Sequence, residues 1–241
     1  MALFGANTIF PGSTQNILRL YNTPGEGVPA AFPGRNQIIP AGLVGCVSIR
    51  PSVASVIAGD LDEQLTTYFR SAPSGSLVTA WHEGNGNHGI KAADFRAMHV
   101  HLANLALAVA PHIFYGAIID AYPVNHDGQE LAEWVPPAVR FVGIDGYQSG
   151  PAVTVDDVFG KCESQLAAIP GMGPRLITET NTVHGDQAAW LTDAAAFAFA
   201  HNYVGFMPFV GGPPGEPPVP PVPAALVDVL GVMAATAAIH D

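Results

Sequence analysis

Eight short and strongly apolar segments recur along this chain, and their recurrence restricts the possible fold more than any other feature of the sequence. Several are nearly continuous hydrophobic runs, such as VGCVSI, LVTAW, FVGI and GFMPFV. A strand that is buried on both faces, as in a parallel sheet covered by helices, has this character. The segments cover residues 2–7, 18–22, 45–51, 77–83, 114–120, 141–147, 175–179 and 204–210.

Segments with helical periodicity separate most of these expected strands. Their apolar residues recur three and four positions apart within 61–69, 95–109, 155–169, 188–199 and 226–233. An alternation of strand and helix predicts a parallel sheet. Eight strands in 241 residues predict one domain over residues 1–241, a (β/α)8 TIM barrel of the α/β class. An open doubly wound sheet is the competing fold, and it is disfavoured because no GxGxxG or phosphate loop follows the first strand.

Two parts of the chain depart from this regular alternation. Residues 11–17 and 23–42 are too short, or too rich in Gly and Pro, for full helices, so we expect abbreviated first helices. The segment GGPPGEPPVPPVP (211–223) is interpreted as a stiff polyproline-like loop before the last helix. An interdomain linker is the alternative for this segment, but only one helical segment follows it.

The charge balance excludes several classes of partner. Nine Lys and Arg residues stand against 20 Asp and Glu, which gives a net charge of −11. Nucleic-acid and anionic-membrane binding both need clustered cations, so we expect neither. No apolar run reaches the roughly 20 residues that span a bilayer. Residues 1–10 lack a basic region and a cleavage site, so we expect no export signal. Cys46 and Cys162 are expected to be free buried thiols.

Two glutamates fall at the ends of expected strands. Glu83 ends the fourth strand in the sequence WHEGNG, and Glu179 ends the seventh in LITETN. Active sites of TIM barrels lie at the carboxyl ends of the strands, so these two side chains are expected to face one another across the barrel mouth. Cleavage of an acetal needs one carboxylic acid to protonate the leaving oxygen and a second carboxylate to attack or to position water.

At these strand ends the sequence resembles a known family. WHEGNG is similar to the His-Glu-x-Asn-Gly signature of glycoside hydrolase family 26, the β-mannanase-type retaining enzymes of the four/seven barrel superfamily. FVGIDGY resembles that family's sixth-strand segment, and LITETN resembles its nucleophile strand. SIRP (48–51) is similar to the third-strand segment of small actinobacterial and phage-encoded relatives.

The resemblance implies a role for each matching residue. Glu83 would be the general acid/base and Glu179 the nucleophile. His82 would hydrogen-bond near the nucleophile, and Tyr147 would donate its hydroxyl to it. The substrate-binding residues implied or expected at this end of the barrel are Trp81, His82, Asn85, Tyr147 and Phe209. The family's large aromatic-rich insertion after this motif is missing here, which leaves the cleft length and the sugar open.

The residues themselves leave other interpretations open. Each glutamate could be a strand-end carboxylate in an ordinary salt bridge, although only nine cations are available for 20 acids. Asp120, His126 and Asp127 follow the fifth strand and could line the cleft, but a solvated loop is the expected interpretation. A metal-dependent hydrolase that uses His82, Asp145 and Glu179 is a further alternative, while the main hypothesis needs no cofactor and no metal.

The functional expectation is therefore a retaining glycosidase, an endo-acting enzyme on a β-linked polysaccharide. The alternative is a non-catalytic or weakly catalytic barrel of a phage tail that binds the glycan of a host cell envelope, together with other virion proteins. Because no export signal is expected, such a chain would reside in the virion or in the cytoplasm until lysis.

Overall fold

The computed structural model describes residues 3–6, 16–22, 27–34, 37–86 and 88–209, and their core is a closed barrel of eight parallel strands. Strand β1 pairs with both β2 and β8, and this pairing closes the barrel. Every strand is hydrogen-bonded to its neighbours in chain order. The strands are β1 Leu3–Ala6, β2 Ile17–Tyr21, β3 Val44–Ile49, β4 Leu77–Ala80, β5 Phe114–Asp120, β6 Phe141–Asp145, β7 Arg175–Thr180 and β8 Gly205–Pro208.

Apolar side chains from seven successive strands form a separate cluster of their own, which fills one part of the barrel interior. Its buried members are Ile17, Cys46, Leu77, Ile118, Phe141, Leu176 and Met207, one from each of β2 to β8. Gly116 makes room for the ring of Phe141, since a Cβ at this position would lie 2.4 Å from the ring. This packed layer closes the barrel below the polar residues described in the next section.

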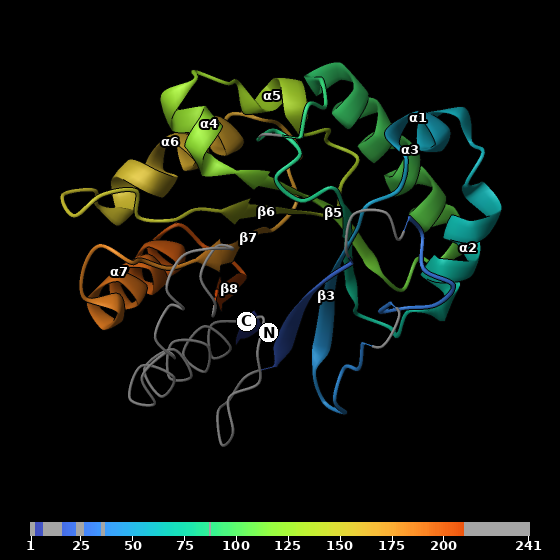
Figure 1. The fold of residues 1–241 in the computed structure, drawn as a ribbon, viewed down its shortest axis with the longest axis horizontal. Coiled ribbons are helices and arrows are strands. Elements are labelled where there is room, and N and C mark those ends of the chain that lie inside the picture. The colour runs from blue at the N-terminus through green and yellow to red at the C-terminus, as the bar shows by residue number, and fades with distance from the viewer. Residues whose placement is uncertain (1–2, 7–15, 23–26, 35–36, 87, 210–241) are drawn as a thin grey trace.

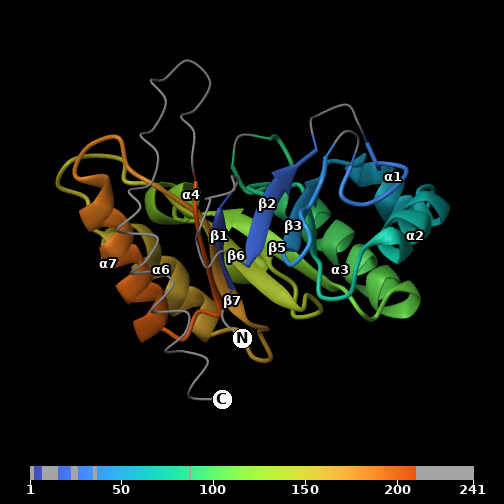
Figure 2. The ribbon, with the colours of Figure 1, turned by 90° about the horizontal axis from the view of Figure 1, so that it is seen from below.

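The helices surround the strands on the outside (Figure 1). In a second view, α6 and α7 lie on one side of the strands, and α1, α2 and α3 lie on the other (Figure 2). A larger apolar cluster joins these helices to the outer faces of the strands. The helices are α1 Val53–Ala58, α2 Asp62–Ser71, α3 Ala92–Val109, α4 Ala121–His126, α5 Leu131–Trp134, α6 Val155–Ala167 and α7 Gln187–Ala200.

The predicted (β/α)8 barrel is confirmed by this topology. Residues 27–34 and 37–43, between β2 and β3, contain no helix, as expected for the abbreviated start of the fold. Cys46 and Cys162 are both free and buried, which confirms that expectation. The Pro-rich segment 211–223 and the expected last helix lie outside the described residues. No helix in the described ranges combines the length and the apolar character that a membrane span requires.

Candidate active site

A turn at the end of β4 sets the position of Glu83. The strand stops at Ala80 rather than at Glu83, because Trp81 and Glu83 both have a positive φ, of 48° and 57°. Non-glycine residues rarely adopt this left-handed conformation, and it is common at functional sites. The Glu83 amide donates a 3.0 Å hydrogen bond to the carbonyl of Ile118 in β5, which ties the strained turn to the barrel.

Asn85 holds the rest of this turn against the end of β5. Its Oδ1 accepts a 2.8 Å hydrogen bond from the Asp120 amide, and its Nδ2 donates to the Asp120 carbonyl at 2.9 Å. The side chain of Gln129 donates to the carbonyl of Asn85 at 3.0 Å. Asn85 is buried, and its amide is occupied by protein partners, so its role in the structure is to hold Glu83 and Asp120 at one place.

Glu179 lies at an irregular point of β7. The register of β7 shifts against β6 between Ile144 and Asp145, and it shifts again against β8. Thr178 donates a hydrogen bond to Asp145, whereas Thr180 accepts one from Trp190 of helix α7 outside the barrel. Residues two apart on a regular strand share a face, so this difference marks a bulge-like break in the alternation. The irregularity redirects Glu179 toward the barrel mouth.

Two phenol donors and one guanidinium surround the Glu179 carboxylate. The hydroxyl of Tyr21 donates to Oε1 at 2.6 Å, and the hydroxyl of Tyr147 donates to Oε2 at 2.6 Å. The Arg19 guanidinium, which is 1% exposed, lies 3.7 Å from Oε1. Hydrogen-bond donors and a nearby cation favour the charged form of a carboxylate. This environment suits an acid that has to stay ionised.

Glu83 lies in the opposite kind of environment. One carboxylate oxygen from each of Glu83, Asp145 and Glu179 lies within 4.8 Å of the other two. The pKa of Glu83 is raised to about 8, first by burial and then by the charges of Glu179 and Asp120, while Arg19 and Arg50 act in the opposite direction. Burial also raises the pKa of Asp145 well above its usual value, with Glu179 and Glu83 as the next causes. Glu83 therefore keeps a proton near neutral pH beside an ionised Glu179.

His82 does not occupy the place that the resemblance implies. Its Nε2 lies 3.3 Å from a guanidinium nitrogen of Arg50, and no hydrogen bond joins it to Glu179 in the described structure. Its ring lies 5.1 Å from that of Tyr21. Burial and the nearby charges of Arg19 and Arg50 lower the pKa of His82 well below its usual value. His82 is thus a neutral ring behind Tyr21, and Tyr21 takes the position next to Glu179.

Two of the expected aromatic residues form a wall beside the glutamates. Phe209 lies edge-on to Tyr147 with ring centroids 6.1 Å apart, and edge-on to Tyr21 at 6.4 Å. Trp81 donates from Nε1 to the Pro51 carbonyl at 2.6 Å. The guanidinium of Arg50 lies 5.5 Å from the Trp81 ring. Trp81 is half-buried, so part of its surface stays open to solvent.

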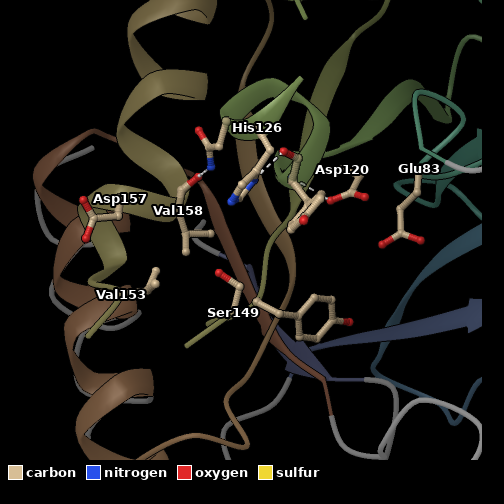
Figure 3. A pocket seen from close by; sticks show the side chains of 10 residues that line it. Glu83, Asp120, His126, Ser149, Val153, Asp157 and Val158 are labelled. Carbon is tan, nitrogen blue, oxygen red and sulfur yellow. Dashed lines mark hydrogen bonds between the residues drawn. The ribbon is translucent and has the colours of Figure 1, made fainter. Parts of the chain in front are cut away.

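A pocket of about 420 Å³ extends from Glu83 over α4 to the start of α6. Glu83 lies at one end and Asp157 at the other, with Asp120 and His126 between them (Figure 3). Asp120 and His126, for which a solvated loop is the expectation from the sequence, both line this pocket. Asp120 caps helix α4 by accepting from the Tyr122 amide at 2.8 Å, and the exposed His126 stacks on the Tyr122 ring at 3.9 Å.

Arg19, Tyr21 and Asp120 are functional candidates that the sequence interpretation did not assign to the site. A signal for the first two exists in the segment ILRLY, where Ile17, Arg19 and Tyr21 alternate along one face of an otherwise apolar strand. Since Ile17 belongs to the interior cluster, its face carries the arginine and the tyrosine into the barrel. The place of Asp120 depends on its hydrogen bonds to Asn85, which no local pattern indicates.

The three clustered carboxylates are spaced closely enough for a cation. His82 is not part of this group, so the ligand set of the metal-dependent alternative, His82 with Asp145 and Glu179, is not formed in the described structure. Both oxygens of Glu179 already accept phenol hydrogen bonds, and Arg19 supplies the positive charge beside them. We therefore assign no metal to this cluster.

The fold is similar to the folds of several solved glycoside hydrolases. No protein-family model and no curated protein sequence matches the chain. Among solved structures, a Cellulomonas fimi endo-β-1,4-mannanase double mutant is 16% identical, with a TM-score of 0.54, over 80% of this chain and 54% of that one. The GH26 β-mannanase of Bacteroides ovatus is 12% identical, with a TM-score of 0.55, over 79% and 68%.

A third similar structure is nearer to this chain in length. It is a GH128 endo-β-1,3-glucanase from Amycolatopsis mediterranei in complex with laminaritriose, 16% identical, with a TM-score of 0.51, over 91% of this chain and 90% of that one. By contrast, the chain spans about half the length of the Cellulomonas fimi structure. The predicted resemblance to family 26 is confirmed at the level of the fold.

Proposed function

We propose that this protein is a retaining glycoside hydrolase that cleaves a β-linked polysaccharide by double displacement, with Glu83 as general acid/base and Glu179 as nucleophile. The observation that carries the proposal is the pairing of two nearby glutamates in opposite environments. One oxygen of Glu83 lies within 4.8 Å of one oxygen of Glu179, a proximity compatible with the spacing of about 5–5.5 Å between the carboxyl groups of retaining pairs. Glu83 has a pKa of about 8, while Glu179 accepts two phenol hydrogen bonds.

The first step uses these two states directly. Glu179 attacks the anomeric carbon of the sugar while the bond between this carbon and the leaving oxygen breaks. Glu83 gives its proton to the leaving oxygen. In the second step Glu83, now ionised, takes a proton from water, and the oxygen of that water displaces Glu179 from the sugar. The protonated Glu83 and the free Glu179 carboxylate are restored. Two successive inversions leave the configuration of the anomeric carbon unchanged.

The residues around the pair fit the contacts that a sugar requires. We assign the exposed faces of Trp81, Tyr147 and Phe209 to the wall of the sugar site, since aromatic faces pack against the apolar faces of pyranose rings. The neutral ring of His82 supports this wall from behind Tyr21. Asn85 is a positioning residue rather than a substrate contact, because its amide is occupied by Asp120 and Gln129.

The pocket beyond Glu83 suits the leaving group. It is lined by Glu83 and Tyr147, whereas Glu179 does not line it. A sugar bound there would therefore touch the acid but not the nucleophile. The partner of this chain is then a polysaccharide or the glycan of a cell envelope. No observation on the described residues favours a purely binding role on a virion, so we propose the hydrolytic function alone.

The test is a screen of purified protein on mannan, xylan, β-1,3-glucan, β-1,4-glucan and mycobacterial-type cell wall, with reducing ends as the readout. The wild type should release reducing sugar from one of them, and Glu179→Ala should abolish the release. Glu63→Gln, an exposed glutamate on helix α2, is the matched control and should keep full activity. Unchanged hydrolysis by the Glu179 variant would end the proposal.

A further inference from the structure

Asp145 is a third carboxyl group in the site, and the double displacement gives it no task. It is the last residue of β6 and is 0% exposed. The hydroxyl of Thr178 donates to its Oδ1, while its Oδ2 is buried without a hydrogen-bond partner. A buried, unpartnered carboxylate oxygen is costly if it carries charge, whereas a protonated oxygen removes that cost and gains a donor.

The count of charges around Asp145 points the same way. One oxygen from each of Glu83, Asp145 and Glu179 lies within 4.8 Å of the other two. Arg19 is the only lysine or arginine buried in the described part of the chain, and it lies 3.7 Å from Glu179. One guanidinium can balance one carboxylate. Three ionised carboxylates at this spacing would leave two buried negative charges without a partner.

The other groups that face Asp145 supply no second positive charge. Tyr21 on β2, Cys46 on β3 and Tyr147 after β6 stay neutral, since burial raises the pKa of each above its usual value. On β7, Thr178 is a neutral donor and Glu179 is the anion. Arg50, at the end of β3, is half-buried beside His82, and its charge acts on Glu83 and Glu179.

We propose that Asp145 is a positioning residue that works as an uncharged carboxylic acid, with its proton on Oδ2 facing the two glutamates. This inference rests on the proposed function, and it accounts for the charges of the three carboxyl groups during the reaction. With Asp145 neutral, the cluster of Glu83, Asp145 and Glu179 carries one negative charge in the free enzyme, on Glu179. After the first step Glu179 is an ester and the negative charge lies on Glu83. The site therefore holds one negative charge opposite Arg19 throughout, and the Asp145 proton can hydrogen-bond to whichever glutamate is ionised.

The experiment compares Asp145→Asn with Asp145→Ala. Asparagine can accept from Thr178 and donate in place of the acid proton, so this variant should keep kcat within about threefold of the wild type, with the alkaline limb of its pH profile within about 0.3 units. Alanine removes the donor and should lower kcat by at least about tenfold. If Asp145 is ionised instead, the asparagine variant removes a negative neighbour of Glu83, and the alkaline limb moves down by about one unit or more.

That downward shift would overturn the inference, and so would an alanine variant as active as the asparagine one. A second measurement needs no substrate. Infrared spectra of the wild type with isotopically labelled aspartate should show a protonated carboxyl band at pH 7 that Asp145→Asn removes and Asp120→Asn keeps. If the spectrum of Asp145→Asn keeps every protonated carboxyl band of the wild type, the inference is overturned even in an active enzyme. A band that vanishes as expected, in a protein that cuts no glycan, would uphold the neutral Asp145 and count against the hydrolase alone.

Discussion

The hydroxyl of Tyr21 donates a 2.6 Å hydrogen bond to Oε1 of Glu179, although 158 residues separate the two along the chain. Tyr147 makes the matching contact with Oε2 from the opposite side of the carboxylate, also at 2.6 Å. The proposed nucleophile, Glu179, is therefore held between two phenols that come from β2 and from the residues after β6. This arrangement fixes its orientation and favours its charge.

Removal of either phenol hydroxyl should weaken catalysis without disturbing the fold. Tyr21→Phe and Tyr147→Phe should each lower kcat/KM about 10- to 100-fold, since a hydrogen bond to a charged group contributes about 1.5–3 kcal/mol. Steady-state kinetics of the two variants and the wild type measure this loss. A Tyr21→Phe variant with full activity would mean that the hydrogen bond from Tyr21 to Glu179 has no part in the reaction.

The charge of Asp120 should set the upper pH limit of activity. Glu83 has to be protonated, and its pKa of about 8 is raised first by burial, then by Glu179, then by Asp120. Asp120→Asn removes the last of these while keeping an oxygen to accept from the Tyr122 amide. The alkaline limb should then fall by on the order of half a pH unit. An unchanged or rising limb would show that Asp120 does not act on the acid.

Glu83 should cost the folded protein stability at alkaline pH. Its folded pKa of about 8 lies above the usual 4.5, so its contribution to stability is complete below about pH 4.5 and is lost as the pH rises to about 8. Glu83→Gln carries no charge and avoids this loss. The variant should gain on the order of 5 kcal/mol in the free energy of unfolding well above pH 8, with little gain near pH 4.5.

Chemical denaturation at several pH values checks this prediction, with Glu63→Gln on the surface of α2 as the control. The control should show no pH-dependent gain. A Glu83→Gln variant that is less stable than the wild type at pH 8 would contradict the assigned protonation state.

The sequence was sufficient to predict the barrel because each strand is a short apolar run buried on both faces. The predicted range 114–120 coincides with β5 Phe114–Asp120, and the others differ by a few residues. The largest difference is at β4, which ends at Ala80 because the positive φ angles of Trp81 and Glu83 depart from the strand. Trp81 extends the apolar run by one residue, and the sequence does not show the change in backbone direction there.

The site was only partly predictable. The proximity of Glu83 and Glu179 could be predicted because matched strand ends meet at one face of a barrel. His82 could not be placed, since its position beside Glu83 in the sequence does not fix the direction of its ring, which contacts Arg50 and Tyr21. The alternation of Ile17, Arg19 and Tyr21 indicates that Arg19 enters the barrel, but it does not show that Arg19 lies beside Glu179. The place of Asp120 depends on its hydrogen bonds to Asn85, which no local sequence pattern reports.

The most direct test of the account is to trap the covalent intermediate on Glu179. The protein is incubated with a panel of activated 2-deoxy-2-fluoro-β-glycosides of gluco and manno configuration, digested, and analysed by mass spectrometry. We expect one sugar per chain, on the peptide that carries Glu179, and no label in Glu179→Gln. Hydrolysis of a β-glycan with inverted product configuration, or a label on any other residue, would contradict the assignment of Glu179 as nucleophile.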